Sequence, residues 1–140
     1  MAELVALAAR LTSGLLAGVF FVFAVAIMPA LSGADDHTFE VSMNRINVSI
    51  VNPVFVLVFF GAPVLAVLAA VMVRAPLLYA AATLAVITLL ITIAANIPLN
   101  NQLAAGAGRP GFEQVWVRWN VVRTVTGIGS FASLLASAGK

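Results

Sequence analysis

The chain has 140 residues, of which 63% are hydrophobic and 9% are charged, and its mean hydropathy is +1.13. Soluble domains carry roughly 25% charged residues, so this composition excludes a soluble globular domain and predicts that the chain lies in a lipid bilayer. The net charge of +2 comes from scattered basic residues, which excludes a nucleic-acid-binding surface, and the absence of cysteine excludes disulfides, iron–sulfur clusters and thiolate zinc sites.

The first predicted element is a membrane-spanning helix. A helix needs about 20 apolar residues to cross the roughly 30 Å hydrocarbon core of a bilayer. Leu11–Ala34 is the first uncharged stretch of that length. We predict a span over residues 4–31, which Pro29 and the following Ser32–Asp36 segment end, because proline lacks an amide donor and glycine and aspartate favour a turn.

A short amphipathic helix is predicted between the first and second spans. Apolar residues recur at helical spacing from residue 38 to residue 50, and polar residues occupy the opposite face. The two sets are Phe39, Met43, Ile46 and Ile50 against Glu40, Asn44 and Asn47. Such a helix is expected to lie in the membrane interface.

The second and third predicted spans form a hairpin. Asn52 followed by proline is typical of a helix N-terminus, and we predict a span over residues 53–73. The turn at Arg74–Pro76 is so short that the next span, over residues 76–97, must run antiparallel. The sequence Asn96-Ile97-Pro98 is expected to end or kink this third helix.

The fourth predicted span has to include charged residues. The last apolar stretch, Thr124–Gly139, has 16 residues. At about 1.5 Å per residue it measures about 24 Å, which is too short to cross the hydrocarbon core. We therefore predict a span over residues 114–137 that carries Arg118 and Arg123 into the membrane.

The complete prediction is an all-α, multi-pass four-helix bundle that forms a single transmembrane domain over residues 1–140. Four spans place both termini on one side of the membrane. The number of basic residues alone favours neither orientation, and we favour cytoplasmic termini in the plasma (inner) membrane.

Polar side chains gather at one end of the predicted bundle, because the loop after span one and the loop after span three lie at the same membrane face. The amide, guanidinium and indole side chains at that end are Asn44, Arg45, Asn47, Asn52, Asn96, Asn100, Asn101, Gln102, Trp116, Arg118, Trp119, Asn120 and Arg123. A polar group in hydrocarbon is costly unless it is paired or faces a wet cavity. We therefore predict a polar pocket.

Aromatic residues of the first two spans are expected to form the walls of this pocket, namely Phe20, Phe21, Phe23, Phe55, Phe59 and Phe60. A purely structural interpretation stays open. The tryptophans then only anchor the interface, the arginines reach out to lipid phosphates, and Asn52 only caps a helix.

Cofactor and oligomer signals are weak. His37 is the only histidine, which excludes bis-histidine haem and multi-histidine copper or iron sites within one chain. With Asp36 and Glu40 it offers at most a weak metal site, so we predict no metal or other cofactor and leave a metal or a haem open. The small residues Gly14 and Gly18, and a similar row from Gly129, favour close helix packing or a homo-oligomer.

Two polar segments and the first span carry a family resemblance. Asn96-Ile-Pro-Leu-Asn-Asn-Gln-Leu103 and Trp116-Val-Arg-Trp-Asn-Val-Val-Arg123 resemble the motifs of the anthrone oxygenase-like family of small four-span membrane proteins. Gly14–Phe21, Met28–Leu31 and the region from Met43 to Pro53 are similar to that family as well. The resemblance covers nearly the whole chain.

The resemblance implies an oxidoreductase. Fungal relatives oxidise the activated methylene of anthrone polyketides with dioxygen, without a conventional cofactor. On this basis Arg123 and the amides of Asn120, Asn96 or Asn100 are expected to stabilise the anion formed from a lipophilic substrate, and Trp116 and Trp119 to stack on it. Asn47 and Asn52 are further expected substrate contacts. The expected base is His37, with Glu40 and Glu113 as alternatives.

Two other functions compete with catalysis. The Asn/Trp/Arg cluster would also suit a non-catalytic scaffold that docks a partner subunit. The same pocket would suit a carrier of lipophilic small molecules.

Overall fold

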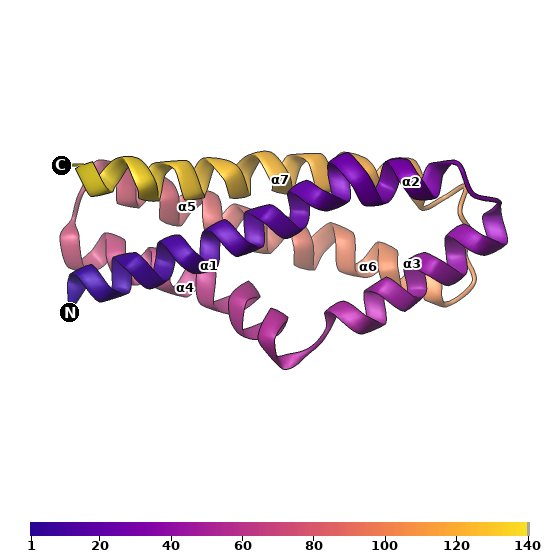
Figure 1. Ribbon diagram of the computed structural model, residues 1–140, viewed down its shortest axis with the longest axis horizontal. Helices are drawn as coiled ribbons and strands as arrows, with labels where there is room; N and C mark the ends of the chain where they lie inside the picture. The colour runs from indigo at the N-terminus through magenta and orange to yellow at the C-terminus, as the bar shows by residue number, and fades with distance from the viewer. Residues whose placement is uncertain (140) are drawn as a thin grey trace.

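The computed structural model describes residues 1–139, and over these residues the chain is all-helical. In chain order the elements are α1 (Ala2–Val22), η1 (Phe23–Ile27), α2 (Met28–Ser32), α3 (Asp36–Ile50), α4 (Pro53–Val73), α5 (Pro76–Ile91), η2 (Thr92–Asn96), α6 (Ile97–Ala104), α7 (Glu113–Ala136) and η3 (Ser137–Gly139). The segments α1, η1 and α2 form one continuous run, as do α5, η2 and α6 (Figure 1).

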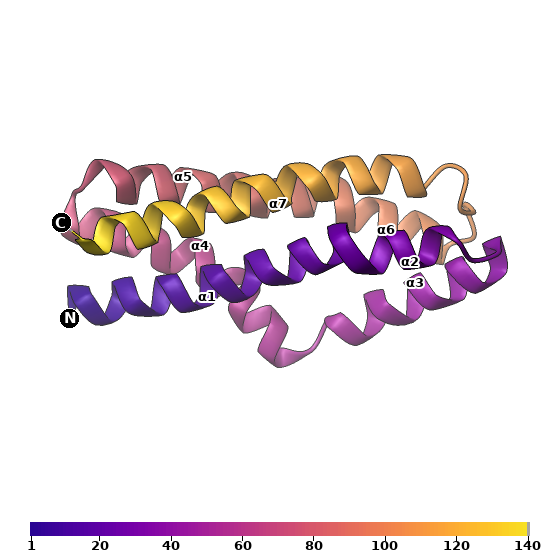
Figure 2. The same ribbon diagram turned by 45° about the horizontal axis from the view of Figure 1, so that its top comes forward.

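The long helices lie side by side (Figure 2). α1 packs against α4 and α7, and α5 packs against the same two helices. Both termini lie at one end, and α3 lies at the opposite end beside α2 and α6. The predicted hairpin between the second and third spans is confirmed, because α4 and α5 pack together across the turn at Arg74.

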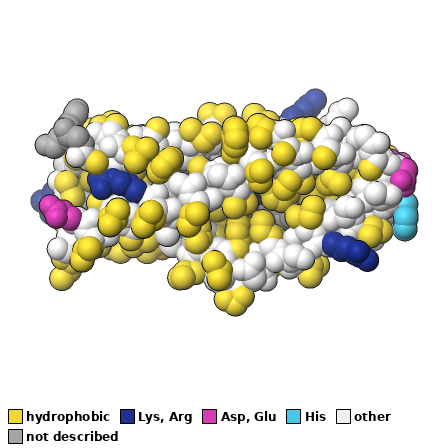
Figure 3. Space-filling model, in the orientation of Figure 1, with side chains coloured by type: hydrophobic (Ala, Val, Ile, Leu, Met, Phe, Trp, Pro, Cys, Tyr) yellow, Lys and Arg dark blue, Asp and Glu magenta, His cyan; other side chains and the backbone are white. Residues whose placement is uncertain are grey.

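Three helical runs are long and apolar enough to cross a membrane, namely Ala2–Ser32, Pro53–Val73 and Pro76–Ala104. Leucine, valine, isoleucine and phenylalanine side chains are exposed along the outside of these helices. On the face shown in Figure 3, hydrophobic side chains cover the middle of the molecule, and charged side chains lie toward its two ends. Such a surface is compatible with contact with lipid hydrocarbon.

The first and third helical runs each contain a five-residue π-helical segment just before a proline, Pro29 or Pro98. The residue before each proline donates its amide to a carbonyl five residues earlier, at Phe23 or at Thr92. Proline in a regular α-helix clashes with the carbonyl four residues earlier, and a local π turn relieves this conflict. The third run therefore continues to Ala104 instead of ending near residue 97.

Residue size changes along the length of the molecule. Near the termini, small residues such as Ala9, Ala66 and Ala81 are completely buried, so the helix backbones approach closely. Gly14 belongs to this region, since a Cβ there would lie 3.1 Å from the ring of Phe131. At the other end the buried side chains are large, namely Phe23, Met28, Phe39, Met43, Leu103, Phe112 and Trp116. The helices are therefore spaced more widely toward the polar end.

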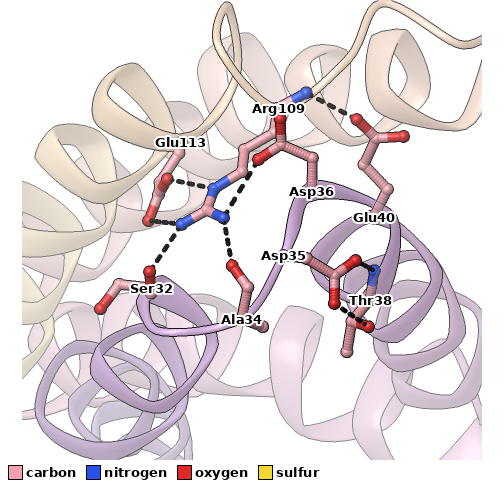
Figure 4. Close-up of polar contacts among 8 residues, drawn as sticks. All are labelled: Ser32, Ala34, Asp35, Asp36, Thr38, Glu40, Arg109 and Glu113. Atoms are coloured by element: carbon pink, nitrogen blue, oxygen red, sulfur yellow. Dashed lines mark hydrogen bonds and ion pairs between the residues drawn. The ribbon is translucent and has the colours of Figure 1, made fainter.

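Arg109 closes the polar end by joining the two connections that meet there (Figure 4). Its guanidinium donates hydrogen bonds to the carbonyl oxygens of Ser32 (2.8 Å) and Ala34 (2.7 Å). Its Nε lies 2.6 Å from Glu113 Oε2, and Nη1 lies 3.2 Å from Asp36 Oδ1. The hydrogen bond to Glu113 raises the pKa of Arg109, and burial opposes this effect. The guanidinium thus stays charged and holds α2 against the start of α7.

Replacing Arg109 is expected to loosen this end. R109A removes five guanidinium contacts at once and leaves two backbone carbonyls without their donors. We expect the midpoint of thermal unfolding in detergent to fall by several degrees. R118A is the matched control, because Arg118 is exposed and makes no side-chain hydrogen bond or ion pair within residues 1–139. Equal midpoints for the two variants would contradict the assigned role of Arg109.

Candidate functional site

Arg123 is the centre of the candidate site. Its side chain projects from α7 and is almost completely buried, with 6% of the residue exposed. Within the described chain it forms no ion pair, because both salt bridges belong to Arg109. A buried charge without an ionic partner is expensive in a protein interior, so other groups must hold the guanidinium.

Asn120 and two aromatic rings hold Arg123. The Arg123 Nε donates to Asn120 Oδ1 at 2.9 Å, and Asn120 Nδ2 donates to the carbonyl oxygen of Phe20 at 3.3 Å. The guanidinium carbon lies 4.3 Å from the centre of the Phe20 ring and 5.1 Å from the centre of the Trp116 ring. Cation–π attraction of this kind partly replaces the lost hydration. Among residues 1–139, the guanidinium finds a hydrogen-bond partner only for its Nε.

A second polar group joins α7 to the third helical run. The indole of Trp116 is 1% exposed and donates to Asn100 Oδ1 at 2.7 Å. Asn96 is completely buried, and its Nδ2 donates to the carbonyl oxygen of Trp116 at 3.4 Å. The Oδ1 of Asn96 and the Nδ2 of Asn47 are buried atoms without a hydrogen-bond partner. These two atoms leave hydrogen-bonding capacity next to Trp116 and Asn100 that a water molecule or a ligand can satisfy.

A cavity of about 200 Å³ lies beside Arg123. Most of its wall is aromatic or aliphatic, and its polar groups come from Asn47, Thr92, Asn100 and Arg123. The stacked pair Phe55 and Phe59, with ring centres 5.8 Å apart, contributes a flat wall. The complete lining is Val19, Phe20, Phe23, Asn47, Ile50, Val51, Phe55, Val56, Phe59, Phe60, Thr92, Ile97, Asn100, Trp116 and Arg123.

The structure brings most of the expected site residues together. Asn47, Asn100, Trp116 and Arg123 line the cavity, and Asn96 and Asn120 bond to its lining residues. Five of the six expected wall residues line it as well. Phe21 is the exception, being 49% exposed because it follows Phe20 by one position and projects from another side of α1.

Three expected site residues lie outside this cavity. Asn52 is exposed and caps α4, since its Oδ1 accepts the amide of Phe55 at 3.0 Å. Trp119 is 41% exposed on the outside of α7. His37 is exposed near the start of α3, and Figure 3 shows the histidine at the far polar end.

The alternative bases lie at the polar end too. Glu113 is ion-paired with Arg109, and Glu40 Oε1 accepts the amide of Arg109 at 2.9 Å. Within residues 1–139 the cavity is therefore lined by no carboxylate and no imidazole. No cluster of three histidine, aspartate or glutamate side chains is positioned to hold a metal ion in that part of the chain.

Sequence reasoning did not identify Thr92 or the part of the wall that comes from Ile50 and Val51. Thr92 lies in an apolar run and gives no polar pattern of its own. Its one distinguishing feature is that the second π-helical segment begins at Thr92. Such segments are frequent at functional sites.

Comparison with known proteins gives one match. The model of a family described as anthrone oxygenase matches residues 39–133, which is more than half of the chain. The matched region extends from α3 into α7 and includes Asn47, Asn96, Asn100, Trp116, Asn120 and Arg123, whereas His37 precedes it. No curated protein and no solved structure matches the chain.

The hydrogen bonds of Asn120 lead to a stability prediction. N120L removes both bonds of this amide and leaves the buried Arg123 Nε without an acceptor. An unsatisfied buried group costs about 1–3 kcal/mol, and we expect a loss of that size in the free energy of unfolding in detergent. Q102L is the control, since Gln102 is exposed. A loss no larger than that of Q102L would show that Asn120 does not support Arg123.

Proposed function

The chain belongs to the anthrone oxygenase family, and on this premise we propose that it is a membrane oxidoreductase. In this proposal it uses dioxygen to oxidise a lipophilic, enolisable aromatic substrate in the cavity beside Arg123. The observation that carries the proposal is the guanidinium of Arg123, which is buried without a carboxylate in a cavity with aromatic walls. A flat molecule that becomes an anion fits both properties.

We further propose that four helices span the membrane, with α7 as the fourth. α7 has 24 residues, which at about 1.5 Å per residue is long enough for the roughly 30 Å hydrocarbon core. It also packs along α1 and α5, two of the apolar runs. α3 then lies in the interface, where its exposed polar residues meet lipid headgroups.

We propose that the protein lies in the plasma (inner) membrane, with both termini on the cytoplasmic side. The termini lie at one end, which also holds the turn at Arg74. The opposite end carries four carboxylates, those of Asp35, Asp36, Glu40 and Glu113. Arg109, in the loop at that end, is ion-paired with two of them. Basic residues in short loops usually face the cytoplasm, and Arg74 is such a residue at the end that carries the termini.

Arg123 would act on the charge that forms in the reaction. An anthrone has a methylene group that loses a proton to give an enolate, whose negative charge lies largely on the ketone oxygen. A fixed cation in a site of low dielectric constant stabilises this charge more strongly than water does. The methylene carbon then bonds to dioxygen and finishes as a carbonyl. One oxygen atom stays on the carbon, and the other leaves with the two methylene hydrogens as water.

Water is the proposed acceptor of the first proton. His37, Glu40 and Glu113 lie outside the cavity, so a side-chain base among them would need a relay. The amides of Asn47 and Asn100 form the polar side of the cavity and offer hydrogen bonds to a water molecule there. Stabilisation of the enolate by Arg123 would then provide the main rate enhancement.

The proposed reaction uses no metal, haem or flavin. The polar lining consists of amide, hydroxyl and guanidinium groups, which are poor or impossible ligands for transition metals compared with imidazole, thiolate and carboxylate. An absorption spectrum and a metal analysis of the purified protein test this part directly. A coloured group or a stoichiometric metal that is required for oxygen uptake would overturn it.

The role of Arg123 can be tested by oxygen uptake with anthrone as substrate. Removing a donor that stabilises a developing oxyanion costs about 100- to 1,000-fold in rate, and we expect R123A to lose kcat/KM on this scale. R123K keeps the charge and is expected to retain more activity than R123A. R118A is the matched arginine control and should match the wild type.

Three results would count against this proposal in different ways. Oxygen uptake by folded R123A at the wild-type rate would refute the site. Binding of anthrone without turnover would favour a carrier. A tightly bound partner protein, with neither binding nor turnover of anthrone, would favour a scaffold.

His37 is expected to be dispensable. It is exposed at the polar end, away from the cavity, so H37A should leave kcat/KM for anthrone unchanged across the neutral pH range. Because proton loss to water is reversible, the fraction of enolate rises with pH, and the rate should rise with pH through this range equally in the wild type and in H37A. A large loss of activity in folded H37A would restore His37 as the base.

A further inference from the structure

The most exposed residues of the cavity wall are apolar. Of the residues that line the cavity, Val51, Val56, Phe60 and Ile97 are the ones with more than a third of their surface exposed. They come from the bend between α3 and α4, from the first half of α4 and from the start of α6. In Figures 1 and 2 this bend projects away from the other helices, so the cavity opens on the side of the molecule rather than at its end.

An apolar furrow leads to this opening from the middle of the molecule. The furrow runs between α4 and α5 and is lined by Phe60, Pro63, Val64, Val67, Leu68, Val86 and Leu89. Phe60 lines both the furrow and the cavity. Its ring meets the ring of Phe59 edge-on, with centres 4.9 Å apart, and Phe59 stacks with Phe55 inside the cavity. Aromatic surface is therefore continuous from the outside of α4 to the cavity.

Aromatic rings close the cavity toward the polar end. Between the cavity and that end lie the buried side chains of Phe23, Phe39, Phe112 and Trp116, which pack ring against ring. The contacts of Arg109 seal the connections beyond them. A second hollow of about 250 Å³, the amide-lined cleft, adjoins the cavity between α3 and α6. Asn44, Asn47, Asn100 and Asn101 line it together with Val48, Val51, Ile97 and Ala104, so the cleft shares Asn47, Val51, Ile97 and Asn100 with the cavity. The cavity thus has an apolar opening beside the furrow, at Val56 and Phe60, and a second opening through the amide-lined cleft.

We propose that the substrate enters the cavity sideways from the lipid hydrocarbon, as a neutral molecule, through a portal formed by Val56 and Phe60. This inference rests on the proposed function, because it requires the helices to span the membrane and the Arg123 cavity to bind the substrate. An apolar rim offers no compensation for the hydration that a charged molecule would lose. The negative charge must therefore form inside, next to Arg123. The expected ligands are flat weak acids such as phenols and enolisable ketones, and permanent anions are excluded.

The absence of cysteine from the chain allows a direct test of the portal. V56C and F60C each place one thiol on the rim, at positions that line the cavity but not the amide-lined cleft. L57C is the matched control on α4, because Leu57 is 73% exposed and does not line the cavity. N44C places a thiol at the amide-lined cleft. All four are made in a W119F background, which leaves Trp116, in the cavity wall, as the only tryptophan.

The measurement needs no turnover. Each variant is reconstituted in phosphatidylcholine vesicles, with or without modification by cyclohexylmaleimide. Quenching of Trp116 fluorescence is then followed after addition of hydroxyanthraquinone, a neutral weak acid, or of anthraquinone sulfonate, a permanent anion. We expect modification to slow quenching by hydroxyanthraquinone at least tenfold in V56C and F60C and to leave L57C and N44C unchanged. The sulfonate should quench little in any variant.

Several outcomes would overturn the portal. These are unchanged quenching in both modified rim variants, slow quenching only in modified N44C, equal quenching by the sulfonate, or no quenching by hydroxyanthraquinone in the unmodified proteins. Comparing each modified variant with its own unmodified form removes any effect of the substitution on folding. Because binding is measured, a protein that binds through the portal but consumes no oxygen would refute the proposed reaction and leave the portal standing.

Discussion

The burial of one uncompensated guanidinium is the constraint on which the rest of the structure depends. Arg123 lies inside an apolar helical protein with one amide acceptor and two aromatic faces around it. These groups hold the cation but do not neutralise it, so the cavity beside it has a positive potential that an anion would satisfy. A scaffold that needed only stability would gain from an apolar residue at this position.

Arg109 and Arg123 carry the same side chain, but their surroundings differ. Arg109 has two carboxylates and two backbone carbonyls, and its contacts tie the loop after α2 to the start of α7. All of its strong donors are used within the protein, so its role is structural. Within residues 1–139 Arg123 uses only its Nε, so its remaining donors can meet the anion of the proposed function.

The shape of the cavity follows from residue size and from two prolines. Alanines let the helices approach near the termini, whereas large rings separate them toward the other end. The π segments before Pro29 and Pro98 keep two helices continuous through this wider region and turn Phe23 and Thr92 toward the cavity.

Local sequence patterns were sufficient to predict the helices, the short hairpin turn and the grouping of polar residues that includes Arg123. The cap at Asn52 was one of two interpretations that they allowed. These features depend on hydropathy, on proline and on short-range hydrogen bonds, which are read within a few residues of the chain. Tertiary structure decided which polar residues share the cavity. Trp116 faces it and Trp119 does not, because each residue turns an α-helix by about 100° and only a narrow arc of α7 faces inward. His37 lies at the far end because α3 begins there, and its distance from Arg123 depends on how the helices pack, which no local pattern contains.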